Sequence, residues 1–307
     1  MSDTAEERIV ADFVANFVAG DGTHREPVSG RVLMSDRRLV LVTGAWRTVI
    51  PLSGVVDVST SAVPENVKTL FDDALLLRYR RASDASPSVV VVGADLATID
   101  RFARLLYRSL VGGGSVSVRH PATTGGVAAA KDWAAGTLTC TPDRVTVTLG
   151  GGGDLHVELP NVVGVGVVTR RVDDGRERVL AVNHRVRGTV VATELHCRVE
   201  RHATLLSRLF RTAIRGPRGE AYREGPTVDD RRLLLSLHAL GGDATPASLA
   251  AALGETEAAV EALLADARER RLVDGDTEGP GPTHAGLVLL FEGESTDERF
   301  VLDGVEV

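Results

Sequence analysis

The fold is decided by a segment that occurs twice: Gly30-Arg-Val-Leu-Met-Ser-Asp-Arg-Arg-Leu-Val-Leu-Val42 and Gly136-Thr-Leu-Thr-Cys-Thr-Pro-Asp-Arg-Val-Thr-Val-Thr148. In both copies a strand-like run leads to a turn, an arginine (Arg38 or Arg144) and an alternating strand. After a one-residue shift, residues 50–58 also match residues 157–165. Self-similarity over this length indicates two copies of one structural unit.

Each copy continues with turn-separated strands and ends in one amphipathic helix. Further strands are expected at residues 74–80 and 88–93 in the first copy, and at 164–171, 177–183 and 188–198 in the second. The helices are expected at 97–110 and 202–214, where apolar residues recur at helical spacing. Gly112-Gly-Gly and Thr123-Thr-Gly-Gly, between the copies, are expected to be linker or surface loop.

A single amphipathic helix can close the open end of a bent sheet and remove its apolar side chains from water. The pattern therefore predicts an α+β chain with two tandem pleckstrin-homology-like half-barrels, at about 25–112 and 128–216. Each would be closed by its C-terminal helix.

The pattern changes from Thr227 onwards. Helices are expected at residues 228–240, which end in Gly241-Gly242, at 247–253 and at 256–271. A β-like wing follows, with a tip at Gly279-Pro-Gly-Pro and the apolar run 287–291. This order is typical of a winged helix-turn-helix. The predicted domains are thus residues 1–112, 113–217 and 218–307.

Winged helices commonly bind DNA through their second turn-motif helix, which here is acidic. Residues 255–271 carry five acidic and three arginine side chains. Negative charge there would repel phosphate and release no counterions. Protein contact, including a homodimer, is the favoured interpretation, and a DNA-binding transcriptional regulator with the half-barrels as sensors is the alternative.

Composition predicts a cytoplasmic protein. The 307 residues include no apolar run of about 18, and the first residues are acidic, unlike a secretory signal. Two cysteines are too few for a disulfide framework or a structural zinc site. Of 35 basic residues only Lys68 and Lys131 are lysines, and residues 226–307 hold 17 acidic side chains against six arginines.

No catalytic constellation is recognisable, so no enzyme activity and no cofactor are expected. The glycine runs 112–114 and 150–153 do not continue as a phosphate-binding loop, and 150–153 is expected to be a hairpin tip. The eight histidines show no metal-ligand spacing, and there is no GxSxG motif.

Two charged segments are the candidate partner-binding surfaces. Six arginines surround Val172-Asp-Asp-Gly on two neighbouring hairpin strands, and they would form either a solvated face or a receptor for acidic groups. Three glutamates begin the acidic helix. The candidate residues are Arg170, Arg171, Arg176, Arg178, Arg185, Arg187, Glu255, Glu257 and Glu261. Binding of anionic lipid head groups is a minor third hypothesis, because lysine is scarce.

Three stretches carry a family resemblance. The segment 30–42, the run Arg47-Thr-Val-Ile-Pro-Leu-Ser-Gly-Val-Val-Asp-Val and the run Pro282-Thr-His-Ala-Gly-Leu-Val-Leu-Leu-Phe-Glu-Gly resemble the archaeal taxis protein CheF family. The likeness extends over nearly the whole chain, and the arginine-rich, lysine-poor composition suits a haloarchaeal member.

The resemblance implies a non-enzymatic adaptor in archaeal chemotaxis. Such a protein would connect the phosphorylated response regulator CheY, together with CheC and CheD proteins, to the switch complex on the cytoplasmic side of the archaellum motor. The motifs are strand and turn motifs, so no individual binding residue is carried over from the family.

Overall fold

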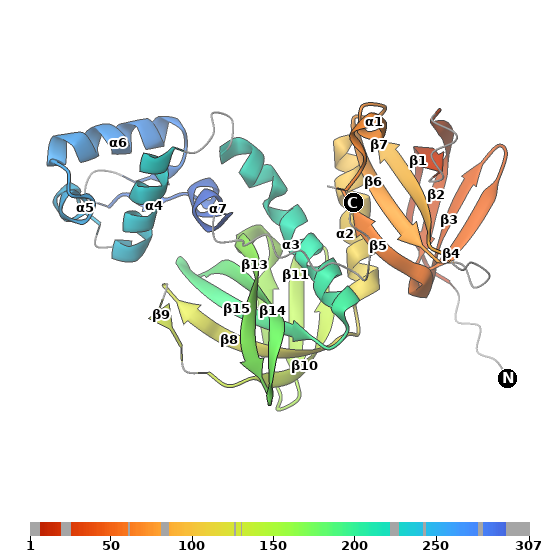
Figure 1. Ribbon diagram of the computed structural model, residues 1–307, viewed down its shortest axis with the longest axis horizontal. Coiled ribbons are helices and arrows are strands. Elements are labelled where there is room, and N and C mark those ends of the chain that lie inside the picture. Colours follow the sequence, from red (N-terminus) through yellow and green to blue (C-terminus); the bar gives the residue numbers. More distant parts are fainter. Residues whose placement is uncertain are drawn as a thin grey trace. The chain divides into compact units, whose positions relative to one another are not determined.

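The computed structural model describes residues 7–19, 26–60, 62–80, 86–125, 127–129, 131–221, 227–241, 244–275 and 279–292. The chain divides into two compact units. The first comprises Met1–Gly112, Cys140–Pro142 and Thr204–Leu209, and the second comprises the remaining residues. Both units are α+β, with large antiparallel sheets and several helices (Figure 1).

The first unit contains a seven-stranded sheet in the order β4-β3-β2-β1-β7-β6-β5. Its strands are β1 (Ile9–Ala19), β2 (Val28–Ser35), β3 (Arg38–Thr43), β4 (Arg47–Pro51), β5 (Val55–Ser59), β6 (Asp73–Tyr79) and β7 (Ser88–Ala94). Its helices are η1 (Leu52–Gly54), α1 (Glu65–Lys68) and α2 (Leu96–Val111). Asp95 caps α2 by accepting a 2.9 Å hydrogen bond from the Thr98 amide. One face of α2, including Ile99, Phe102 and Leu106, is buried.

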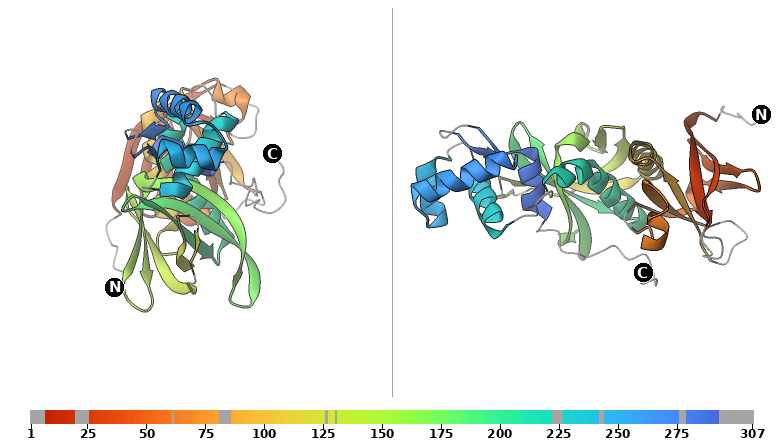
Figure 2. Two further views of the ribbon diagram at one scale, coloured as in Figure 1. Left: turned by 90° about the vertical axis from the view of Figure 1, so that its left-hand side faces the viewer. Right: turned by 90° about the horizontal axis from the view of Figure 1, so that it is seen from above.

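The second sheet has the order β12-β11-β10-β8-β15-β14-β13, with β9 beside β8. Its strands are β8 (Ser115–Thr124), β9 (Val127–Ala128), β10 (Ala134–Cys140), β11 (Arg144–Leu149), β12 (Asp154–Glu158), β13 (Val162–Val172), β14 (Gly175–Val186) and β15 (Thr189–Cys197). The 3-10 helix η2 (Leu159–Asn161) precedes β13, and α3 (Glu200–Ala221) follows β15. Figure 2 shows these strands curving rather than lying flat.

The two sheets repeat the same connectivity strand for strand. Gly30 and Gly136 mark the equivalence, because each packs against the neighbouring strand where a side chain would not fit. A Cβ at Gly30 would lie 2.2 Å from the Val42 carbonyl oxygen, and one at Gly136 would lie 2.8 Å from that of Thr148. Leu52 and Leu159 likewise donate equivalent backbone hydrogen bonds, to the carbonyls of Arg37 and Asp143. The sequence repeat is thus also a structural repeat.

The C-terminal segment adds α4 (Val228–Leu240), α5 (Pro246–Leu253), α6 (Glu257–Glu269), the two-residue strands β16 (Val273–Asp274) and β17 (Gly281–Pro282), and α7 (His284–Glu292). Capping boxes at Thr227 and Thr245 begin α4 and α5. The apolar faces of α4, α5 and α6 pack into one core that includes Leu233, Leu249 and Leu264. Helix α7 also packs on β13, since Leu287 and Val288 cluster with Val163 and Val190.

Several expected boundaries are wrong. Strands β1 and β8 precede the expected starts at 25 and 128, and Thr123 and Thr124 end β8 instead of lying in a linker. In β1, two adjacent apolar residues recur every four residues, a spacing that is typical of a helix. It is nevertheless a strand because β2 and β7 supply backbone partners on both edges.

Two further expectations concern an apolar run and a glycine run. The apolar run 287–291, expected after the wing tip, lies in α7. The glycines 150–153 form the β11–β12 hairpin tip, as expected. Gly242 lies outside the described residues. None of the described helices is both long and apolar enough to span a membrane.

Candidate partner-binding surfaces

The β13–β14–β15 strands separate the six candidate arginines into two groups. Arg171 pairs directly with Arg176 near the β13–β14 turn, and Arg178 lies two residues further along the same face. Arg185 and Arg187 lie at the other end of β14, at the turn into β15. The expected single cluster around residues 172–175 is therefore limited to Arg170, Arg171, Arg176 and Arg178, because a strand extends about 3.3 Å per residue.

Arg170 belongs to an ion cluster around a buried carboxylate on the opposite face of the hairpin. The Glu194 side chain on β15 is only 3% exposed. One of its carboxylate oxygens accepts a 2.8 Å hydrogen bond from Arg170 Nε, and the other accepts hydrogen bonds from the Arg119 guanidinium. Two arginines thus compensate one buried carboxylate, which without them would be strongly unfavourable.

Trp133 covers this cluster and connects it to the exposed arginines. The Arg119 guanidinium carbon lies 5.2 Å from the Trp133 ring centroid, in a cation–π arrangement. The Trp133 indole Nε1 donates a 2.9 Å hydrogen bond to the Arg171 carbonyl oxygen. The position of the Arg171–Arg176 pair is thereby fixed by packing as well as by the hairpin.

A neutral histidine pair lies on the inner face of the same strands. The Thr193 hydroxyl lies 2.8 Å from both His120 Nδ1 and His184 Nε2, so it donates to one ring and accepts from the other. Burial lowers the pKa of His184 to about 4, with a smaller contribution from His120. Burial and the Lys131 charge also lower the pKa of His120. These rings are structural and uncharged at neutral pH.

The acidic helix contributes to a groove in the C-terminal segment. A cavity of about 420 Å³ is lined by acidic and apolar side chains from α4, the end of α5 and α6: Asp229, Arg232, Leu253, Glu255, Ala259, Ala262, Leu263 and Asp266. Arg232 is held by a 2.8 Å hydrogen bond to the Leu253 carbonyl. Asp229 lies 3.7 Å from Arg232 and Asp266 lies 3.5 Å from Arg270, so Glu255 is the lining carboxylate that makes no ion pair with a described residue. Together with Glu257 and Glu261, which are exposed on α6, it makes this surface negatively charged.

Metal and thiol chemistry finds no support in the described part of the chain. No group of three potential ligands occurs among those residues. Burial raises the pKa of the Cys140 thiol to about 11 and that of the Cys197 thiol to about 12. Both cysteines are therefore protonated and behave as small apolar side chains.

Arg119, Glu194 and Trp133 were not predicted from the sequence as members of a charged site. Arg119 lies on β8, a strand that was not expected. Glu194 gave a usable signal, because a charged residue inside the apolar run 190–195 is almost never buried without a partner. Which arginine pairs with it depends on strand order and could not be read from the sequence.

Comparison with known proteins finds similarity over most of the chain. The chain matches the family model described as "Archaeal Chemotaxis signal transduction system protein F" over residues 9–215. It is 34% identical to "Taxis protein CheF2" of Halobacterium salinarum over 286 residues, covering 93% of this chain and 97% of that protein. It is 26% identical to "Taxis protein CheF1" of the same organism, covering 81% and 85%.

The chain therefore belongs to the archaeal chemotaxis signal transduction protein F family. Among solved structures, a C-terminal domain of an unknown protein from Leishmania infantum is 16% identical over 35% of this chain and 89% of that one. Its TM-score of 0.26 is too low to bear on the fold.

Proposed function

We propose that this protein is a non-enzymatic adaptor that connects phosphorylated CheY, with CheC- and CheD-type proteins, to the archaellum switch complex. It would act on the cytoplasmic side of the motor. The observation that carries this is the presence, in one chain, of the adjacent exposed Arg171–Arg176 pair on a hairpin and of an acidic groove. Surfaces sorted by charge orient different partners and speed their association.

The finer fold assignment is part of the same proposal. The assignment to two pleckstrin-homology-like half-barrels is supported by the strand order that the two sheets share and, in the first copy, by the buried face of α2. The helices α4, α5 and α6 with the β16–β17 pair have the order of a winged helix-turn-helix. The domains would then be residues 1–112, 113–217 and 218–307.

A role as a DNA-binding regulator is disfavoured by the charges on α6. Glu257 and Glu261 are exposed on the helix that would enter the major groove, and Glu255 precedes its N-cap residue Thr256. Lys or Arg at such positions normally neutralises phosphates. A protein partner with basic groups fits this surface better.

The proposal is tested by binding of the full chain to purified phosphorylated CheY and switch-complex proteins. The Glu257→Lys/Glu261→Lys variant and the Arg171→Glu/Arg176→Glu variant should each lower the binding affinity for at least one partner tenfold or more. Asp154→Lys, in the exposed β11–β12 hairpin, is the matched charge control and should change nothing. Failure of every partner to bind the unchanged chain, or salt-sensitive binding to duplex DNA instead, would contradict the adaptor role.

A further inference from the structure

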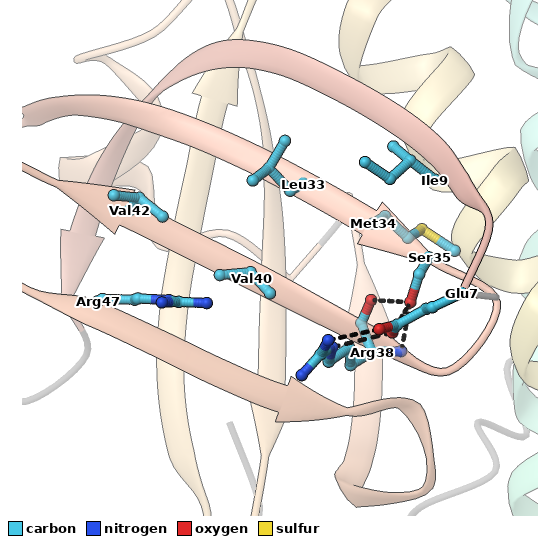
Figure 3. A pocket seen from close by; sticks show the side chains of 9 residues that line it. All are labelled: Glu7, Ile9, Leu33, Met34, Ser35, Arg38, Val40, Val42 and Arg47. Carbon is cyan, nitrogen blue, oxygen red and sulfur yellow. Dashed lines mark hydrogen bonds and ion pairs between the residues drawn. The ribbon is translucent and has the colours of Figure 1, made fainter. Parts of the chain in front are cut away.

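The outer face of the first sheet carries an apolar groove. Its cavity of about 500 Å³ lies over β2, β3 and β4, beside the start of β1. Leu33, Val40 and Val42 form much of its floor, and Ile9, which is 61% exposed, flanks it. Figure 3 shows Arg47 at one end of this row of side chains and Arg38 with Glu7 at the other.

The two ends of the groove differ in charge balance. Arg38 is neutralised, because its Nε donates a 2.9 Å hydrogen bond to Glu7, whose carboxylate also accepts one from the Ser35 hydroxyl. Arg47 is exposed and makes no ion pair with any residue that the structure describes. The groove thus presents one uncompensated positive charge next to an apolar floor.

The second sheet shows that the fold does not require this apolar face. Strand register makes Leu33, Val40 and Val42 equivalent to Thr139, Thr146 and Thr148. On the edge strands, Arg47 and Val49 are equivalent to Asp154 and His156. Because the same strands form with polar residues at all five positions, the strand pairing does not require an apolar outer face, although Val40 itself is buried in this copy.

The edge strand β4 indicates what kind of ligand fits. It ends the strand order and pairs only with β3 among the described strands. An extended peptide can add to such an edge through backbone hydrogen bonds, with alternate side chains on one face. Arg47 and Val49, which is 40% exposed, lie two residues apart on the outer face. A complementary strand would place a carboxylate near Arg47 and an apolar side chain two residues away.

We propose that the groove over β2, β3 and β4 docks an extended peptide segment of a partner protein, with an acidic and an apolar residue two positions apart. The inference adds a third interaction surface and does not depend on the adaptor role, because it rests only on the first unit. The acidic residue would pair with Arg47, and the apolar side chain would pack against Val49 and extend across β4 towards Val42.

The test uses a phage-displayed library of random 12-residue peptides selected against the full chain. Enriched sequences should carry an acid and an apolar residue two positions apart. A synthetic peptide of the most enriched sequence should bind at least tenfold more weakly to Arg47→Asp and to Val42→Thr. These substitutions introduce the residues that the second sheet carries, so the melting temperature should be retained. Val14→Thr, 70% exposed on β1 outside the groove, is the matched control.

Several results would overturn the proposal. These are the absence of enrichment, selection of basic peptides, and binding that is insensitive to Arg47 and Val42. Binding to phosphatidylglycerol vesicles that is lost in Arg47→Asp would assign the surface to a membrane instead. A dimer, seen by light scattering, that dissociates in Leu33→Thr would assign it to a second copy. If the chain binds the selected peptide but does not bind CheY, only the adaptor role is contradicted.

Discussion

The two sheets have matching inner faces and contrasting outer faces. Inside, Phe17, Val92 and Leu75 of the first sheet correspond to Val118, Leu195 and Leu180 of the second, and all are buried. On the outer faces, the same strand pairings make Val18 and Val91 of the first sheet equivalent to Arg119 and Glu194 of the second. The inner face determines the fold, and the outer face is free to differ.

The outer residues stabilise each copy in a different way. In the first sheet Val18 and Val91 pack with Val63 and the partly buried Phe71. In the second, the equivalent space holds the Arg119–Glu194–Arg170 cluster under Trp133. Burial of hydrocarbon needs no partner of defined geometry, whereas a buried carboxylate does. The second sheet should therefore be the more sensitive to single substitutions and to pH.

Acid is expected to destabilise the second sheet more than the first. The folded-state pKa of His184 is about 4, below the ordinary 6.5, so the unfolded chain binds more protons between these values. Its contribution of about 3 kcal/mol to the free energy of unfolding is complete above pH 6.5 and is lost as the pH falls to 4. Hydrogen exchange at pH 4.5 should rise in residues 175–197 more than in 73–94. The His184→Asn variant should show a smaller difference, and an equal rise in both segments would contradict the assignment.

Removing Glu194 alone should cost more than removing the charged pair. Glu194→Val leaves Arg119 and Arg170 without their carboxylate, and we expect a loss of about 2 kcal/mol, since both arginines are partly exposed. Arg119→Val/Glu194→Val introduces the residues of the first sheet and should recover at least half of that loss. Denaturant unfolding of the two variants provides the measurement. A double variant less stable than the single one would show that the outer faces are not interchangeable.

The two equivalent glycines should respond in the same direction with different magnitudes. Gly30→Ala should destabilise by about 2 kcal/mol and Gly136→Ala by about 1 kcal/mol, because both would be overpacked. The difference follows from the closer backbone carbonyl at Gly30, because the side-chain contacts are alike: an added Cβ would lie 2.6 Å from Phe17 at Gly30 and 2.5 Å from Val147 at Gly136. Thermal unfolding of both variants tests whether the two copies are equivalent. The equivalence is contradicted if only one of the two substitutions lowers the melting temperature.

The smallest effect is expected at Val42. Val42→Thr should change the free energy of unfolding by less than about 0.5 kcal/mol, as is usual for outer-face positions without a buried partner. Leu41→Thr, one residue away on the inner face and fully buried, is the control and should cost several times more. Equal losses at the two positions would mean that the outer valines support the fold after all.

The sequence was most informative where pattern and local chemistry agreed. Helices α2, α4 and α5 were expected within one residue of their bounds, because each has a capping residue and a regular apolar face. Strands β1 and β8 were missed because their character comes from neighbours on both edges. The split of the arginines between the two ends of β14 was also missed, since short separation in sequence is still a long distance along a strand.

By itself the sequence determined that the chain contains two copies of one unit followed by an acidic helical segment, because repeats, caps and charge are local properties. Only the tertiary structure decided what each outer face presents. It paired Glu194 with two arginines distant in sequence and left Arg47 beside a valine floor. The physical reason is that strand order and register, which place residues side by side across a sheet, follow from hydrogen bonds between distant segments.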